Sequence, residues 1–89
     1  MANAYRNITT NTTTVVKSGA GILHAVIINA PAATGTITIY DNTAASGNII
    51  ATITMVAGQA ISIPYNIFFS TGLTIVTAVS AGNITIAFT

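Results

Sequence analysis

Hydrophobic and polar residues alternate with a period of two along most of this chain. The clearest case is residues 34–42, in which Ile37 and Ile39 alternate with two threonines and a tyrosine. Successive side chains of a β-strand point to opposite faces, so this pattern predicts a half-buried strand with the isoleucines on its inner face. Gly35 before the alternation and Asp41-Asn42 after it are typical of strand ends.

The same alternation predicts further strands, at residues 12–17, 22–29, 49–56, 60–65, 73–79 and 84–89. Short turns rich in Gly, Asn, Ser and Pro separate them, and residues 66–72 are read as a short extended piece before a turn at Gly72. No segment combines a helical period with a capping signal. The sequence therefore predicts an all-β fold of seven or eight short strands: a single antiparallel β-sandwich, jelly-roll or Ig-like, or a small barrel.

Two segments carry more specific predictions. In residues 22–29, strict alternation puts Leu23 on one face and Val26 on the other, with apolar residues on both faces. Such a strand is either central in the fold or covered by another subunit. Proline lacks the N–H that a sheet needs, so Pro31 is expected to end this strand, and Pro64 predicts an edge strand or a strand end.

The chain length of 89 residues suits one domain. Residues 2–13 are polar and rich in Asn and Thr, and they show no periodicity that would indicate a buried element. We therefore predict an extended polar N-terminal arm over residues 1–13 and a β-sandwich domain over residues 14–89.

Charged residues make up only 3% of the chain, namely Arg6, Lys17 and Asp41. A solvated monomer usually carries about a quarter charged residues. The outer strand faces are instead expected to be rich in threonine, which occurs 16 times. Uncharged Thr/Ile strands do not prevent pairing at sheet edges, so a homo-oligomer or another protein partner is expected. A net charge of +1 provides no basic field for nucleic acid.

Catalysis and cofactor binding are not expected from this inventory of side chains. One Asp, one His and no Glu exclude a carboxylate pair, and no motif presents a serine to His24 and Asp41. His24 is better read as a hydrogen-bonded or interface residue that faces the same way as Val26. Asp41-Asn42 fits a turn better than a Ca²⁺ site, which needs six to eight ligands. We predict no enzyme activity, no metal and no cofactor.

The candidate partner-contact residues are Tyr5 and Arg6. An aromatic residue beside one of the two cations is a combination enriched at interface anchors, although a disordered tail would explain the segment equally well. The N-terminus has no apolar region typical of a signal peptide. The longest aliphatic run, residues 25–28, is far shorter than a membrane-spanning helix, and no membrane partner is expected.

Several segments together resemble small β-sandwich structural proteins of tailed bacteriophages: residues 16–23, 34–42, 45–47, 64–67 and 70–76. The resemblance covers most of residues 15–89 and leaves the arm uncovered. It implies a virion component, namely a capsid decoration or cement protein. Such proteins bind the major capsid protein, often as trimers, and stabilise the expanded head.

The resemblance transfers no contact residues, because no motif fixes them. It implies a protein made in the host cytoplasm without a signal peptide and located on the outer surface of the capsid. The alternative is a tail, fibre or baseplate β-module that binds host glycans. A secreted adhesin module is a third reading, which the missing export signal disfavours.

Overall fold

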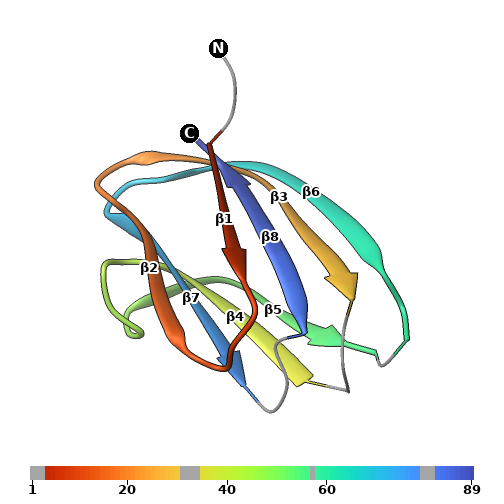
Figure 1. Ribbon diagram of the computed structural model, residues 1–89. Coiled ribbons are helices and arrows are strands. Elements are labelled where there is room, and N and C mark those ends of the chain that lie inside the picture. Colours follow the sequence, from red (N-terminus) through yellow and green to blue (C-terminus); the bar gives the residue numbers. More distant parts are fainter. Residues whose placement is uncertain (1–3, 31–34, 57, 79–81) are drawn as a thin grey trace.

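The computed structural model describes residues 4–30, 35–56, 58–78 and 82–89. Within these ranges the chain forms strands and no helix (Figure 1), so the all-β prediction is confirmed. The eight strands of the described residues are β1 (Ala4–Ile8), β2 (Thr13–Ser18), β3 (Gly21–Ala30), β4 (Gly35–Asp41), β5 (Asn48–Met55), β6 (Ile61–Phe69), β7 (Gly72–Ala78) and β8 (Asn83–Phe88).

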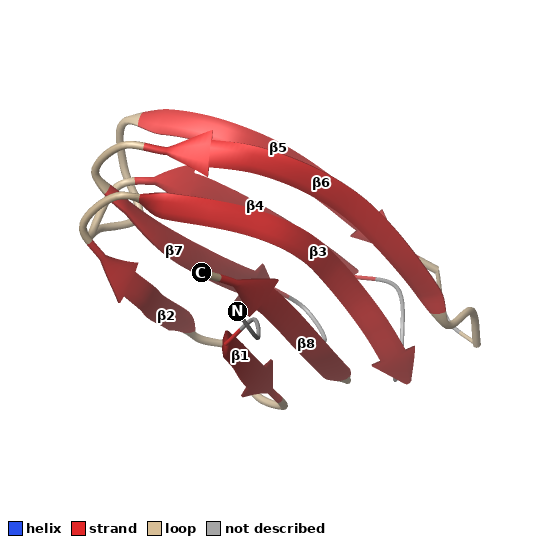
Figure 2. Ribbon diagram, turned by 90° about the horizontal axis from the view of Figure 1, so that it is seen from above, coloured by secondary structure: helices blue, strands red, loops and turns tan. Residues whose placement is uncertain are grey.

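The strands form two four-stranded sheets, which are separate layers in Figures 1 and 2. The first, sheet A, has the order β1-β8-β3-β6, and the second, sheet B, has the order β2-β7-β4-β5. All neighbouring strands are antiparallel. Each sheet mixes strands from both halves of the chain, so residues far apart in sequence become neighbours on one face.

Hydrophobic side chains from both sheets form one buried cluster. The buried members are Ile8, Leu23, Val26, Ile28, Ile37, Ile39, Met55, Phe69, Leu73, Ile75, Ile84 and Ile86. Ile37 and Ile39 are fully buried. The residues that alternate with them, Thr36, Thr38 and Tyr40, are half-buried. The alternation over residues 34–42 is therefore confirmed over the part of it that the structure describes. Burial of such aliphatic side chains, at about 1.5–3 kcal/mol each, is the main stabilising contribution available to a chain without disulfides.

Part of the segment predicted as an arm belongs to sheet A. Residues 4–8 are extended and pair with β8 in continuous register, from Ala4 opposite Phe88 to Ile8 opposite Ile84. Ile8 is buried and joins the hydrophobic cluster, which the polar sequence around it did not predict. This strand is the eighth, where the sequence predicted seven or eight.

The strict alternation predicted for residues 22–29 is wrong, because a β-bulge interrupts β3. Leu23 and Ala25 lie opposite the adjacent residues Phe88 and Ala87 of β8, so His24 is an extra residue. An extra residue shifts the side-chain alternation by one. Leu23 and Val26 are consequently both buried, whereas His24 is only half-buried and does not share the inner face with Val26.

A second bulge lies opposite the first, on β6. Between Pro64 and Ile67, Tyr65 and Asn66 face the single residue His24. Asn66 has a φ of 55°, in the left-handed region that asparagine tolerates better than most residues. β6 therefore continues past Pro64 to Phe69, where the sequence predicted two separate pieces. Of the two alternatives predicted from Pro64, the edge strand is confirmed by the position of β6 at the end of sheet A, and the strand end is wrong because the strand continues to Phe69.

Some predicted turns lie outside the described residues. These are the strand end at Pro31, the loop over residues 31–34 and the first half of the turn over residues 80–83. The turn over residues 42–47 is described, and Asn42 organises it by donating to the Ser46 carbonyl at 2.9 Å.

Candidate interaction surfaces

The register of sheet A brings four distant residues into one row on its outer face. Tyr5 lies opposite Ala87, Ala87 opposite Ala25, and Ala25 opposite Pro64. The inward neighbours along these strands include the buried Ile86 and Val26, so the row itself faces away from the core. All four side chains lack charge, and Tyr5 is 74% exposed. The row forms an uncharged strip across the full width of the sheet.

A pair of apolar residues extends this surface on the other side of the β3 bulge at His24. Ile22 and Phe68 are direct cross-strand partners, and they are 40% and 66% exposed. An exposed phenylalanine beside an exposed isoleucine is more apolar than most solvated sheet surfaces. We call Tyr5, Ile22, Ala25, Pro64, Phe68 and Ala87 together the sheet A surface.

Amide and hydroxyl groups order the far end of the same face. Asn7 donates to the side-chain oxygen of Asn83 at 2.7 Å, and Asn29 donates to the same oxygen at 3.2 Å. Asn29 also donates to Oγ1 of Thr85 at 2.9 Å. These bonds connect β1, β8 and β3 side by side, so polar groups here satisfy one another without charge.

The outer face of sheet B is dominated by threonine. Thr36 lies opposite Thr54, and Thr38 lies opposite Thr52, which gives two adjacent threonine pairs on β4 and β5. The neighbouring row consists of Val15, Thr74, Tyr40 and Ile49. Val15 and Ile49 are 46% and 56% exposed. This face is also uncharged, with apolar residues at both ends of one row.

The three charged residues all avoid the outer faces. Arg6 lies opposite the buried Ile86, and Lys17 opposite the buried Leu73. Asp41 follows the buried Ile39 by two residues, on the same side of β4. Arg6 is exposed, and Lys17 and Asp41 are half-buried. Each of the three points inward in register but lies at the margin of its sheet, where it is not fully covered. The outer faces of sheets A and B therefore carry none of the three charged side chains.

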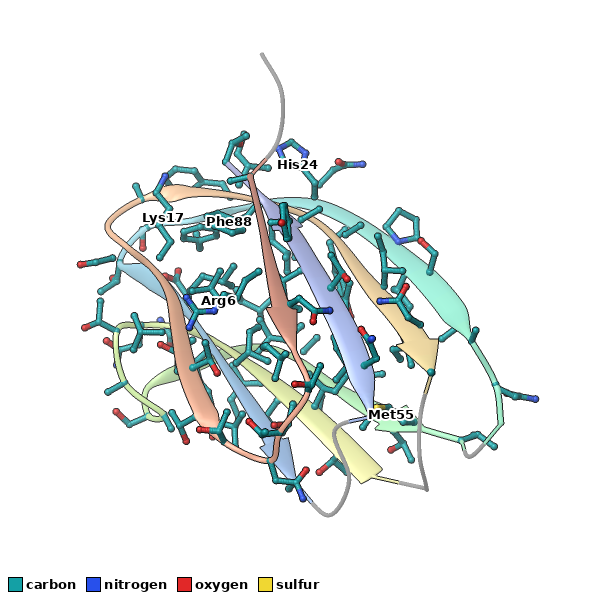
Figure 3. The ribbon with its side chains drawn as sticks, viewed as in Figure 1. Arg6, Lys17, His24, Met55 and Phe88 are labelled. Carbon is teal, nitrogen blue, oxygen red and sulfur yellow. The ribbon has the colours of Figure 1, made fainter. Side chains whose placement is uncertain are left out.

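Of the two predicted contact residues, Tyr5 belongs to the sheet A surface and Arg6 does not. They are consecutive on a strand and point to opposite sides. Figure 3 shows Arg6 extending from β1 toward β2, where a polar hollow of about 330 Å³ lies. Five threonines between residues 9 and 14 line it together with Arg6, Ile8 and Val15.

The segment that lines the hollow is held by one buried threonine. Thr77 Oγ1 donates to the Thr10 carbonyl at 2.8 Å and accepts from the Thr12 amide at 3.0 Å. The Thr77 amide donates to the Thr12 carbonyl at 3.0 Å. Because Thr77 is 4% exposed, these bonds fix the link between β1 and β2 from inside the molecule.

His24 and Asp41, the side chains closest in chemistry to catalytic or metal-binding groups, have structural hydrogen-bond partners. His24 Nε2 lies 2.9 Å from Thr89 Oγ1, and Asp41 accepts from the backbone amides of Ser70, Thr71 and Gly72. The hydrogen bonds from Thr71 and then Ser70 lower the pKa of Asp41 below its ordinary value. Within the described ranges, no three His or acidic residues gather into a metal-binding group.

Sequence reasoning identified Tyr5 and Arg6 because their residue types are rare in this chain, but it missed Ile22 and Phe68. The only available signal was a pair of adjacent phenylalanines, Phe68 and Phe69, in an alternating strand. One of two consecutive strand residues must face outward. Phe69 is fully buried, which leaves Phe68 outside.

The chain matches no protein-family model, and no significant match was found among curated proteins or solved structures. No helix in the described part of the chain is long and apolar enough to cross a membrane.

Proposed function

We propose that this chain is a non-enzymatic virion structural protein of a tailed bacteriophage, a decoration or cement protein that binds the major capsid protein. The observation that carries the proposal is that the outer faces of both sheets bear no charged side chain. A face of this kind, with Tyr5, Ile22 and Phe68 exposed, is better suited to contact with protein than to solvent. On the expanded head, such contacts between capsomers would add stability to the shell.

We infer further that the two sheets form a jelly-roll sandwich. The first strand pairs with the last, the second with the seventh, the third with the sixth and the fourth with the fifth. This is the pairing of one long antiparallel hairpin rolled into two layers. Jelly rolls occur in viral capsid and lectin domains, so the fold is compatible with a virion role by analogy.

The test is binding to expanded heads of the parent phage that have been purified without this protein. We expect saturable binding, visible as added density on the head surface by cryo-electron microscopy, and a higher temperature for DNA release. Phe68→Ser and Ile49→Ser, on the outer faces of sheets A and B, form a matched pair. We expect one of them to lose binding while keeping the fold, which identifies the face in contact. Heads without added density would refute the proposal.

A second candidate is a tail, fibre or baseplate module that binds host glycans, and the hollow beside Arg6 favours it. Hydroxyl groups and a guanidinium are suitable partners for an acidic sugar. A glycan array would test this reading. Saturable binding of carboxylated glycans that is lost in Arg6→Gln and kept in Lys17→Gln would favour it over cementing.

A further inference from the structure

The two sheets end in four edge strands: β1 and β6 in sheet A, and β2 and β5 in sheet B. An edge strand presents unpaired backbone N–H and C=O groups, which can pair with a strand of another molecule. Proteins usually prevent this with charged residues, proline or β-bulges on the edge.

Three of the four edges carry such features. β1 is short and contains Arg6. β2 contains Lys17 and a bulge at Val16. β6 contains Pro64 and the bulge at Asn66. Each of these strands is therefore a poor template for regular pairing.

The fourth edge, β5, is unprotected along most of its length. It has no charged residue and no proline, and its single bulge lies near its start, at Ile50. From Ala51 to Met55 its pairing with β4 is regular. Within the described chain β5 pairs with β4 alone, which leaves its other side free.

We propose that β5 pairs antiparallel with β5 of a second copy of this chain, around a two-fold axis, to form a continuous eight-stranded sheet. Residues 42–89 contain no charged side chain, so two copies meet here without like-charge repulsion. With the axis at Ile53, Thr52 of one copy lies opposite Thr54 of the other. The threonine pairs on β4 and β5 then extend into rows of four across the contact.

The exposed apolar residues at the two ends of β5 support this register. Val56 follows Ile53 by three residues, and Ile49 precedes it by four. Ile50 is the extra residue of the bulge, so Ile49 and Val56 lie at about the same distance along the strand from Ile53. Ile49 of one copy therefore comes close to Val56 of the other. These side chains are 56% and 52% exposed in the single chain, and the pairing would cover both.

This inference names a surface for the self-association that the uncharged strand edges lead us to expect, and it predicts a dimer rather than the trimer implied by the phage resemblance. It concerns the isolated chain, so its failure would be distinct from a failure to bind phage heads. A two-fold contact uses the same strand on both copies and closes on itself.

Sedimentation of the isolated chain tests the proposal. We expect the wild type at micromolar concentration to have twice the 9.0 kDa mass of the chain. Thr54→Lys should be a monomer, because it places two charges at the two-fold contact. Thr13→Lys is the matched control, an exposed threonine on β2 at the opposite edge of the same sheet, and should remain a dimer. A wild-type monomer or trimer, or equal effects of both variants, would overturn the proposal.

Cross-linking provides a readout that does not depend on Thr54→Lys folding. The chain has no cysteine, so introduced thiols are the only ones present. Opposed residues of antiparallel strands have Cα atoms about 4.5–5.5 Å apart, within the range of a disulfide. A mixture of Thr52→Cys and Thr54→Cys should therefore form a mixed disulfide faster than either variant forms one alone. Equal rates in the mixture and in the separate variants would contradict the register.

Discussion

Asp41 Oδ1 accepts a hydrogen bond from the backbone amide of Thr71 at 2.9 Å, although the two residues are 30 positions apart. The same carboxylate accepts from the amide of Ser70 at 3.1 Å and that of Gly72 at 3.4 Å. Asp41 ends β4, and residues 70–72 connect β6 to β7. The single acidic side chain of the protein therefore joins the end of sheet B to the turn that leads out of sheet A.

This arrangement predicts how stability depends on acid. The pKa of Asp41 is lowered in the folded state, so its ionised form stabilises the fold. That contribution is present above the unfolded pKa of about 3.9 and is lost as pH falls through the lower folded pKa. We expect the free energy of unfolding, measured by urea denaturation, to be nearly constant between about pH 5 and pH 7 and to fall below about pH 4.

Asp41→Asn is the informative variant for this acid dependence. It should be less stable at neutral pH, because a neutral amide oxygen is a weaker acceptor for the three amides. It should also lose most of the decline in acid, because Asp41 is the single acidic side chain of the chain. An acid slope unchanged from the wild type would show that Asp41 does not cause it.

Alkaline pH should act through Tyr65. Its side chain is packed against the hydrophobic cluster, and desolvation raises its pKa above the ordinary value of 10.0. Because the pKa is higher in the folded state, the neutral phenol contributes stability that is fully present below the unfolded pKa. This contribution is lost as pH rises through the folded pKa. We expect stability to decline above about pH 10 and the decline to be smaller in Tyr65→Phe. Tyr5→Phe, at a 74% exposed position, is the control and should keep the wild-type slope.

The sequence predicted strands well wherever no bulge interrupts them. Residues 35–41 follow strict alternation, and Ile37 and Ile39 are buried as predicted. In β3 the prediction was wrong, because the bulge at His24 depends on the opposing Tyr65–Asn66 bulge of β6. A local pattern contains no information about an extra residue on a partner strand some 40 positions away.

The candidate surfaces were only partly predictable for a related reason. The rarity of charged and aromatic residues identified Tyr5, and the threonine content predicted uncharged outer faces. The row that joins Tyr5 to Ala87, Ala25 and Pro64 exists only because of strand order. The side chains of alanine and proline carry no polar or charged group, so nothing in their local sequence indicated that they belong to one surface.

Thr77 should contribute more to stability than its size indicates. Its hydroxyl is buried and bonded to the main chain at Thr10 and Thr12. Thr77→Val preserves the shape and removes the hydroxyl, so the partly buried Thr10 carbonyl and Thr12 amide lose this partner, at a cost of about 0.5–1.5 kcal/mol. Thermal unfolding would measure the loss. Thr36→Val, at a half-buried outer position of β4, is the control and should change stability little.

Hydrogen exchange would locate the effect of Thr77→Val. The hydroxyl holds the link between β1 and β2, so the Thr12 amide should exchange faster in this variant, while the amides of β4 change less. Uniform acceleration over all strands would instead indicate a general loss of stability, without a local role for Thr77.

Gly21, the first residue of β3, has no room for a side chain. A Cβ there would lie 2.8 Å from Cζ of Phe69 and would also contact the main-chain oxygen of Thr89. Phe69 is fully buried and cannot move aside without repacking the core. Gly21→Ala should therefore destabilise the protein by about 1–3 kcal/mol, as overpacking typically does. Phe69→Leu shortens the opposing ring, so the double variant should lose less stability than the sum of the two single variants. Additive losses in chemical denaturation would show that the contact with Phe69 is not the cause.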